Sequence, residues 1–212
     1  MISADDELLA TWRALVGDGH AATEQVLVDR HAEPHRRYHT AEHVARVVRH
    51  VDALGTAMGI DADLLDEVRV AALFHDIVYD PRSNTNEADS AAVADQSLAA
   101  AGWSVARRSA VRSLIEATAA HDASSTQEEI LLDADLAVLG GELDAYRRYV
   151  AGVRFEYAHV DDPAWRVGRS AVLRSFLDRA HIFATPIMSH EREAAARSNL
   201  AAELDDLGRR PD

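Results

Sequence analysis

The chain of 212 residues contains no cysteine. Disulfides, thiolate nucleophiles and cysteine-rich zinc sites are therefore excluded, and any metal ion must be held by histidine, aspartate or glutamate. The sequence also lacks an apolar run near the roughly 20 residues that a bilayer span needs. Its opening, MISADDELLATW, does not show the basic and then apolar order of a secretory signal. These absences predict a cytoplasmic protein that does not enter a membrane.

Positive charge is scarce, because 22 lysine and arginine residues face 36 acidic ones and the formal net charge is −14. Non-specific binding of nucleic acid relies on cationic side chains that neutralise phosphates, so nucleic acid is not an expected partner. A small anionic substrate remains compatible with this balance, because converging arginines or a metal ion can supply positive charge locally. The sequence leaves open whether the chain forms a homo-oligomer.

Strand patterns are missing as well. Runs of β-branched residues with strict alternation are absent, and no proline interrupts a segment with helical periodicity. Hydrophobic residues make up 48% and charged residues 27%, which is typical of a globular chain. We therefore predict an all-α fold. The length favours a single domain over residues 1–212, with a core at about 30–140 and C-terminal helices at about 142–207 that pack on it.

Hydrophobic periodicity predicts about ten helices. Capping residues mark several of the starts, namely Thr40, Asp61, Ser104 and Asp162, the last followed by Pro163. The expected helices cover roughly 4–16, 20–32, 40–58, 61–77, 87 onward, 104–120, 126–138, 142–158, 162 onward and 189–207.

A His-Asp pair, His75-Asp76, interrupts the otherwise apolar run 71–79. Burying a carboxylate without a partner costs typically several kcal/mol, so a compensating group is expected. A divalent cation fits, because imidazole nitrogen and carboxylate oxygen are good ligands for transition metals. From this context alone, a core histidine paired with its neighbour or with an arginine explains the pair equally well. A second pair, His121-Asp122, lies at a helix end before a polar loop and is the weaker candidate.

Two further apolar segments carry residues that bind metals. His39 and His43 are four apart, a spacing that places both on one helix face, and His43 leads directly into an apolar face. Asp133 and Asp135 lie in the apolar run 131–139, although acidic residues are rarely buried without a reason. Three such segments are better explained by one shared site than by separate accidents.

The order His…His-Asp…Asp on helices resembles the HD superfamily of metal-dependent phosphohydrolases, in particular its group of uncharacterised predicted members. The resemblance rests on six sequence motifs: RYHTAEH at 37–43, FHDIVY at 74–79, NEADSA at 86–91, DADLAVLG at 133–140, RFEY at 154–157 and ARSNL at 196–200. The similar region spans roughly residues 30–205. It implies an all-α core with a metal between helices, held by His43, His75, Asp76 and Asp135, with Asp133 as the rival for the last position.

The activity implied by this resemblance is hydrolysis of a nucleotide or other small phosphate ester. The metal would make hydroxide available near neutral pH and polarise a phosphoryl oxygen, and Asp76 would also orient the attacking water. Glu87 could act as a general base, hold a metal-bound water, or only favour a helix N-terminus. His121 could bind a second metal, protonate the leaving oxygen, or only favour a helix C-terminus.

Arginines are the expected phosphate ligands, because the guanidinium fork matches phosphate oxygens. The candidates are Arg37, Arg154, Arg169 and Arg197, and His39 would face the substrate or support a metal ligand. Arg154 fits a surface ion-pair network equally well. The expected cofactor is Mn²⁺, Fe²⁺, Co²⁺, Ni²⁺ or Zn²⁺, one or two ions per chain; Mg²⁺ is less natural with imidazole but stays open.

Two other functions are compatible with the same ligands. A di-iron oxygenase of the HD type would need a second metal, with His121 and Glu87 as required ligands. A non-catalytic helical module would hold a structural metal or none. A structural site is closed to solvent, whereas a catalytic site keeps an open position.

Overall fold

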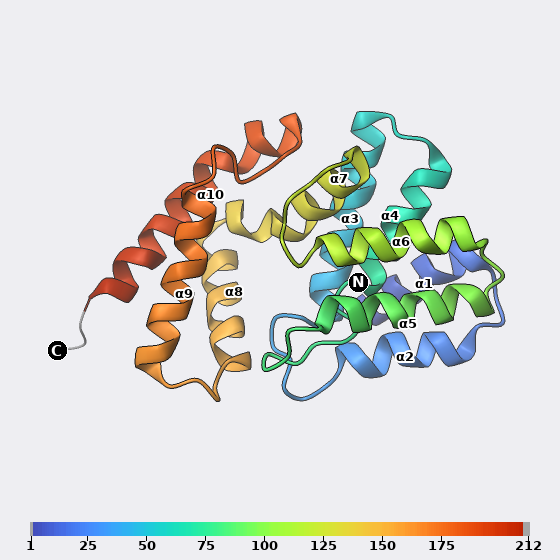
Figure 1. Cartoon of the computed structure of the whole chain (residues 1–212), viewed down its shortest axis with the longest axis horizontal. Coiled ribbons are helices and arrows are strands. Elements are labelled where there is room, and N and C mark those ends of the chain that lie inside the picture. The colour runs from blue at the N-terminus through green and yellow to red at the C-terminus, as the bar shows by residue number, and fades with distance from the viewer. Residues whose placement is uncertain (1, 210–212) are drawn as a thin grey trace. The chain divides into compact units, whose positions relative to one another are not determined.

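The structure is a computed structural model that describes residues 2–209. Across these residues the chain forms ten α-helices and one 3-10 helix, and no strand (Figure 1). The helices are α1 (Ala4–Val16), α2 (Ala21–His31), α3 (Ala41–Met58), α4 (Ala62–Phe74), α5 (Asn86–Ala100), α6 (Val105–Ala117), α7 (Thr126–Leu136), η1 (Ala137–Gly140), α8 (Leu143–Glu156), α9 (Asp162–Leu177) and α10 (Pro186–Gly208). The prediction of an all-α fold with about ten helices is confirmed. In this described part of the chain, none of the helices combines the length and the apolar character that crossing a membrane requires.

The chain divides into two compact units, with Ala134 as the last residue of the first and Asp135 as the first residue of the second. In the first unit α3 packs on α4, α4 packs on α6, and α5 runs beside α6. In the second unit α10 packs on both α9 and η1. The prediction of a single domain over the whole chain stays a prediction.

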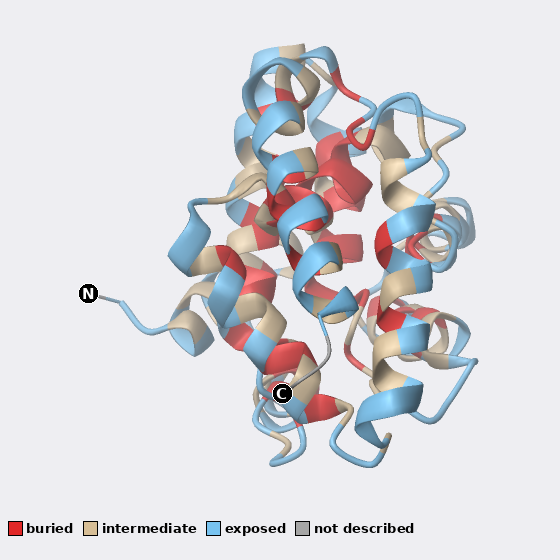
Figure 2. Cartoon of the chain, turned by 90° about the vertical axis from the view of Figure 1, so that its left-hand side faces the viewer, coloured by how far each residue is buried: buried red, intermediate tan, exposed pale blue. Residues whose placement is uncertain are grey.

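Helices α3 and α4 form a core hairpin of the first unit. Their apolar residues recur at helical spacing, and Val44, Val51, Val68 and Ala71 are all fully buried. In Figure 2 buried residues lie along the sides of helices that face other helices. Gly59 ends α3 in the left-handed conformation at a φ of 66°, and the short connection makes α3 and α4 antiparallel. The first turn of α3 and the last turn of α4 therefore share one end of the hairpin.

Several predicted helix starts agree with the structure and others do not. The Asp61 and Ser104 side chains accept hydrogen bonds from the first turns of α4 and α6, as predicted. Thr40 occupies the N-cap position of α3, but its side chain makes no capping hydrogen bond. The prediction for α9 was wrong by one residue, because Asp161 caps the helix and Asp162 is its first residue.

Two further boundaries differ because of local side-chain chemistry. Helix α10 begins at Pro186, three residues before the predicted start, because Thr185 caps it and proline is well suited to the first helical position. Helix α6 ends at Ala117 instead of about Ala120, and the Thr118 hydroxyl donates to the carbonyl of Ile115 where the helix stops.

Gly140, the last residue of η1, provides a test of packing inside the second unit. A Cβ atom at Gly140 would lie 2.5 Å from Cβ and 2.7 Å from the carbonyl oxygen of Arg192. We expect Gly140→Ala to lower the free energy of unfolding by about 1–3 kcal/mol, since overpacking against backbone forces a shift. The matched control is Gly168→Ala inside α9, where no atom lies within 4 Å of the added carbon. The control should gain roughly 0.5–1 kcal/mol in urea unfolding, and equal effects of the two substitutions would contradict the packing of α10 on η1.

Candidate metal centre

His43 and His75 face each other at the shared end of the α3–α4 hairpin. Their Nε2 atoms lie 3.1 Å apart, and each residue is only 2% exposed. The Asp76 Oδ2 atom lies 3.0 Å from Nε2 of His75 and 3.4 Å from Nε2 of His43. Three atoms that can each coordinate a metal ion thus form a triangle with nearly equal sides. The Asp76 side chain is 20% exposed, which makes it the corner with the most access to solvent.

The chemistry of this triangle fits a divalent cation. Nδ1 of His75 lies 2.9 Å from the carbonyl oxygen of Ala72, and donation there leaves Nε2 of the neutral ring with its lone pair. Two imidazole lone pairs cannot face each other at such a distance without a proton or a cation between them. Ligand atoms about 2.0 Å from a common ion lie about 3.3 Å apart in tetrahedral and about 2.8 Å apart in octahedral coordination. The observed separations of 3.0, 3.1 and 3.4 Å match these values.

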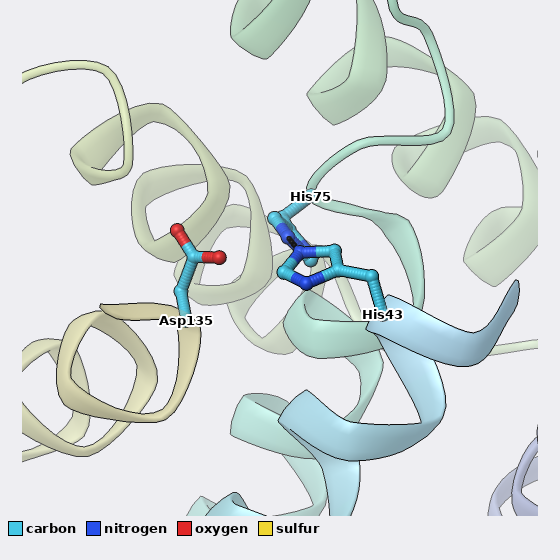
Figure 3. Close-up of side chains that lie close together, drawn as sticks. All are labelled: His43, His75 and Asp135. Carbon is cyan, nitrogen blue, oxygen red and sulfur yellow. Dashed lines mark hydrogen bonds between the residues drawn. The ribbon is translucent and has the colours of Figure 1, made fainter. Parts of the chain in front are cut away.

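A second carboxylate reaches the histidines from α7. Ligand atoms of His43, His75 and Asp135 all lie within 4.8 Å of one another (Figure 3). Asp135 is the first residue after the boundary of the first unit, but the preceding part of the same continuous helix belongs to that unit. Gln127, near the start of α7, donates to the Glu67 carboxylate on α4 at 3.2 Å. The helix that carries Asp135 is therefore anchored to the helix that leads to His75.

Asp133, the rival for the last ligand position, lies on the same helix. It is 1% exposed and is not in the group with the histidines. Two residues apart on an α-helix point in directions about 200° apart, so only one of the two aspartates can face the same ligands. The structure groups Asp135 with the histidines.

The electrostatics of the triangle keep the Asp76 carboxylate ionised. Burial alone would raise the pKa of Asp76. In the metal-free centre with its histidines protonated, the positive charges of His75 and His39 and hydrogen bonds from His43 and His75 hold that pKa well below its usual value. A carboxylate must be deprotonated to bind a metal ion. The site therefore presents Asp76 in the form that a metal ligand requires.

His39 lies beside the centre rather than among the grouped ligands. Its ring centroid is 5.7 Å from that of His43 and 4.1 Å from that of Tyr79. The field of His39 also acts on Asp76. This position suits a residue that supports His43 or faces a substrate.

Ser90 ties the start of α5 to the segment that follows Asp76. Its buried hydroxyl accepts from the Val78 amide at 3.1 Å and lies 3.2 Å from the Val78 carbonyl oxygen, to which it donates. Glu87 precedes Ser90 by three residues and therefore shares its side of the helix. Thr85 holds the N-cap position of α5, and Asn86, its first residue, binds both backbone groups of Asp80. Sequence reasoning missed Ser90, although it belongs to the NEADSA motif.

His121 does not close α6 as predicted. The helix ends four residues earlier, and His121 adopts a left-handed φ of 49° in the following turn. Within residues 2–209, the group of three candidate ligands is His43, His75 and Asp135, and His121 is not a member.

Three of the four predicted phosphate-binding arginines are engaged within the second unit. Arg154 donates to backbone carbonyls just beyond α8, and Arg197 donates to the carbonyls at the end of α9. Arg169 pairs with the buried Glu203 carboxylate. Their role as phosphate ligands stays a prediction. Arg37 is exposed and lies two residues before His39.

His31 gives the first unit a predicted sensitivity to acid. Burial lowers the pKa of His31 to about 4, because the ring is 3% exposed and its Nε2 atom has no hydrogen-bond partner. A folded-state pKa below the unfolded value of about 6.5 means that stability is present above pH 6.5 and is lost as the pH falls toward 4. We expect the metal-free protein to lose roughly 2 kcal/mol of unfolding free energy between pH 7 and pH 5 through this residue.

Urea unfolding at the two pH values tests this expectation. In His31→Gln, which cannot be protonated, the difference between pH 7 and pH 5 should shrink by that amount. A control substitution at exposed His181 should leave the difference unchanged. An equal loss in His31→Gln and in the unsubstituted protein would show that another group causes the acid sensitivity.

The all-α fold and the centre define a helical protein in which His43, His75 and Asp135 could hold a metal ion. A family model described as HD domain matches residues 40–148, just over half of the chain. The chain therefore belongs to the HD domain family, which generally comprises metal-dependent phosphohydrolases. No curated protein and no solved structure matches it. The resemblance inferred from the sequence motifs is confirmed.

Proposed function

We propose that this chain is a divalent-metal-dependent phosphohydrolase that cleaves a nucleotide or another small phosphate ester. The observation that carries the proposal is the triangle of His43 Nε2, His75 Nε2 and Asp76 Oδ2, with sides of 3.0 to 3.4 Å. Asp135 supplies a further carboxylate to the two histidines. Membership of the HD domain family supports the same class of reaction.

The side chains of the centre and its neighbours would have different roles in the proposed reaction. His43, His75, Asp76 and Asp135 would hold the ion, which supplies an acidified water and a polarised phosphoryl oxygen when it is bound. Asp76, as the most exposed of the triangle, would accept a hydrogen bond from the attacking water and orient it. Glu87, at the start of α5, would take up a proton as general base. His121 is the proposed proton donor for the leaving oxygen.

Among the side chains, only arginine and protonated histidine can offer a positive charge to the substrate's phosphate, because the chain contains no lysine. Arg37 is exposed and lies close in sequence to His39 and His43, at the end of the hairpin where the two histidines meet. We therefore assign the first phosphate contact to Arg37, with His39 facing the substrate. The net charge of −14 favours a small phosphorylated substrate over nucleic acid.

Phosphate release from a panel of compounds tests the proposed function. The panel contains nucleoside monophosphates, cyclic nucleotides, nucleoside triphosphates and inorganic polyphosphate, each assayed with Mn²⁺ or with chelator. Because a cyclic nucleotide opens to a monophosphate without releasing phosphate, its product is detected by chromatography. We expect release that requires the metal, that His75→Ala abolishes and that the control Asp122→Ala retains. Bound iron without phosphate release would favour the oxygenase. Release that continues in chelator or in His75→Ala would contradict the proposed mechanism.

A further inference from the structure

Arg36 is buried beside the metal centre and joins two segments of backbone there. Its side chain has no exposed surface. Nη1 donates to the carbonyl oxygens of His39, at 3.1 Å, and Asp76, at 2.7 Å, and Nη2 donates to that of Ile77 at 3.1 Å. One guanidinium group thus connects the segment that enters α3 with the turn that leaves α4. Sequence reasoning missed this residue, although it lies in the polar stretch before His39.

Arg36 binds backbone carbonyl oxygens and leaves the Asp76 carboxylate to the two histidines. An arginine next to an aspartate often forms a bidentate pair with its carboxylate, but Arg36 binds the Asp76 backbone, and Oδ2 stays with His43 and His75. Helix α4 ends at Phe74, so the carbonyls of the following turn lie beyond its helical hydrogen bonds. Arg36 supplies donors at this point, and the direction of the Asp76 side chain follows from the turn that Arg36 holds.

The charge of Arg36 is compensated without using a ligand of the centre. Nε donates to Oε2 of Glu33 at 3.0 Å, and the guanidinium carbon lies 5.5 Å from the centroid of the Tyr79 ring. A buried cation needs such partners, because desolvation is costly. Since Glu33 and Tyr79 provide these partners, the Asp76 carboxylate is not needed as the counter-ion of Arg36, and its oxygen remains directed at the two histidines.

We propose that Arg36 is a positioning residue of the metal centre, which fixes the turn that presents the Asp76 carboxylate to His43 and His75. The inference rests on the proposed metal binding at these three residues. Lysine cannot replace Arg36, because its single nitrogen lacks the planar fork that reaches both backbone segments and Glu33 at once. Loss of the fork should therefore lower metal affinity separately from any loss of stability.

Co²⁺ titration of the full chain, stripped of metal by a chelator, tests this role. Co²⁺ reports affinity and, through its visible absorption, the arrangement of its ligands. The variants are Arg36→Lys and the control Arg69→Lys. Arg69 also connects α3 with α4, through Asp52 at 2.6 Å, but lies six residues before His75. We expect Arg36→Lys to weaken Co²⁺ binding about 10–100-fold and to change the absorption spectrum, as losses of supporting groups do. Arg69→Lys should bind Co²⁺ within about twofold of the unsubstituted protein.

The outcomes separate this inference from the proposed function. An Arg36→Lys variant with an unchanged spectrum and a Co²⁺ affinity within about twofold of normal would overturn the positioning role, whatever its stability. Failure of the unsubstituted protein to bind Co²⁺ would contradict the proposed function as well. If Arg36→Lys does not fold, Glu33→Gln weakens the Nε contact and leaves the three backbone contacts of Arg36 in place, although it also removes the exposed ion pair of Glu33 with Arg30. It should lower Co²⁺ affinity by more than about twofold, and an unchanged affinity would overturn the inference.

Discussion

His75→Ala and Asp76→Ala are each expected to abolish metal retention. Each substitution removes one corner of a triangle whose sides measure 3.0 to 3.4 Å. Losing a group that only supports a ligand typically costs about 10–100-fold in metal affinity, and losing a ligand itself should cost more. Elemental analysis after dialysis should find about one or two ions per chain in the unsubstituted protein and almost none in either variant.

The control for this experiment comes from the second His-Asp pair of the chain. Asp122 is exposed, follows His121 and is not grouped with candidate ligands among the described residues. Asp122→Ala should retain the normal metal content, and circular dichroism should show all variants to be helical. A normal metal content in Asp76→Ala would refute the ligand assignment.

Arg169→Met is expected to lower the free energy of unfolding by roughly 3–5 kcal/mol, the usual cost of leaving one member of a buried ion pair alone. Arg169 and Glu203 are 7% and 9% exposed, and their two parallel contacts measure 2.7 and 3.0 Å. The Tyr146 hydroxyl also donates to Glu203, and burial together with this carboxylate raises the pKa of Tyr146. Urea unfolding of the metal-free protein measures the loss.

The double variant Arg169→Met with Glu203→Leu separates the pair from a phosphate-binding role. Replacing both charges with apolar groups should recover most of the lost stability, because neither charge then remains buried without a partner. Metal content should be normal in the single and the double variant. Normal stability of Arg169→Met together with weakened binding of inorganic phosphate would instead identify Arg169 as a phosphate ligand.

The sequence predicted the part of the fold that follows from local patterns. The valines after His43 and the apolar run around His75 define two helix faces, and the Asp61 cap separates the helices. An antiparallel hairpin built from such helices brings the start of one to the end of the other, which is where the two histidines meet. The resemblance to the HD superfamily then predicted that Asp76 and Asp135 supply the carboxylates of the centre.

The contacts of the arginines could not be predicted in the same way. Arg36 binds backbone carbonyls about 40 residues away, and carbonyls carry no signal in a sequence because every residue has one. Arg169 meets Glu203 from 34 positions away, and an arginine in an internal pair looks the same in sequence as one that binds phosphate. Residue type alone therefore did not separate structural arginines from candidate ligands.

A crystal structure of the protein, grown with Mn²⁺ or Zn²⁺ and measured at the absorption edge of that metal, tests the proposed metal centre most directly. We expect an anomalous peak about 2.0–2.2 Å from Nε2 of His43, Nε2 of His75 and a carboxylate oxygen of Asp76. A crystal with no anomalous peak between these atoms, or with a peak only next to other residues, would contradict metal binding by His43, His75 and Asp76.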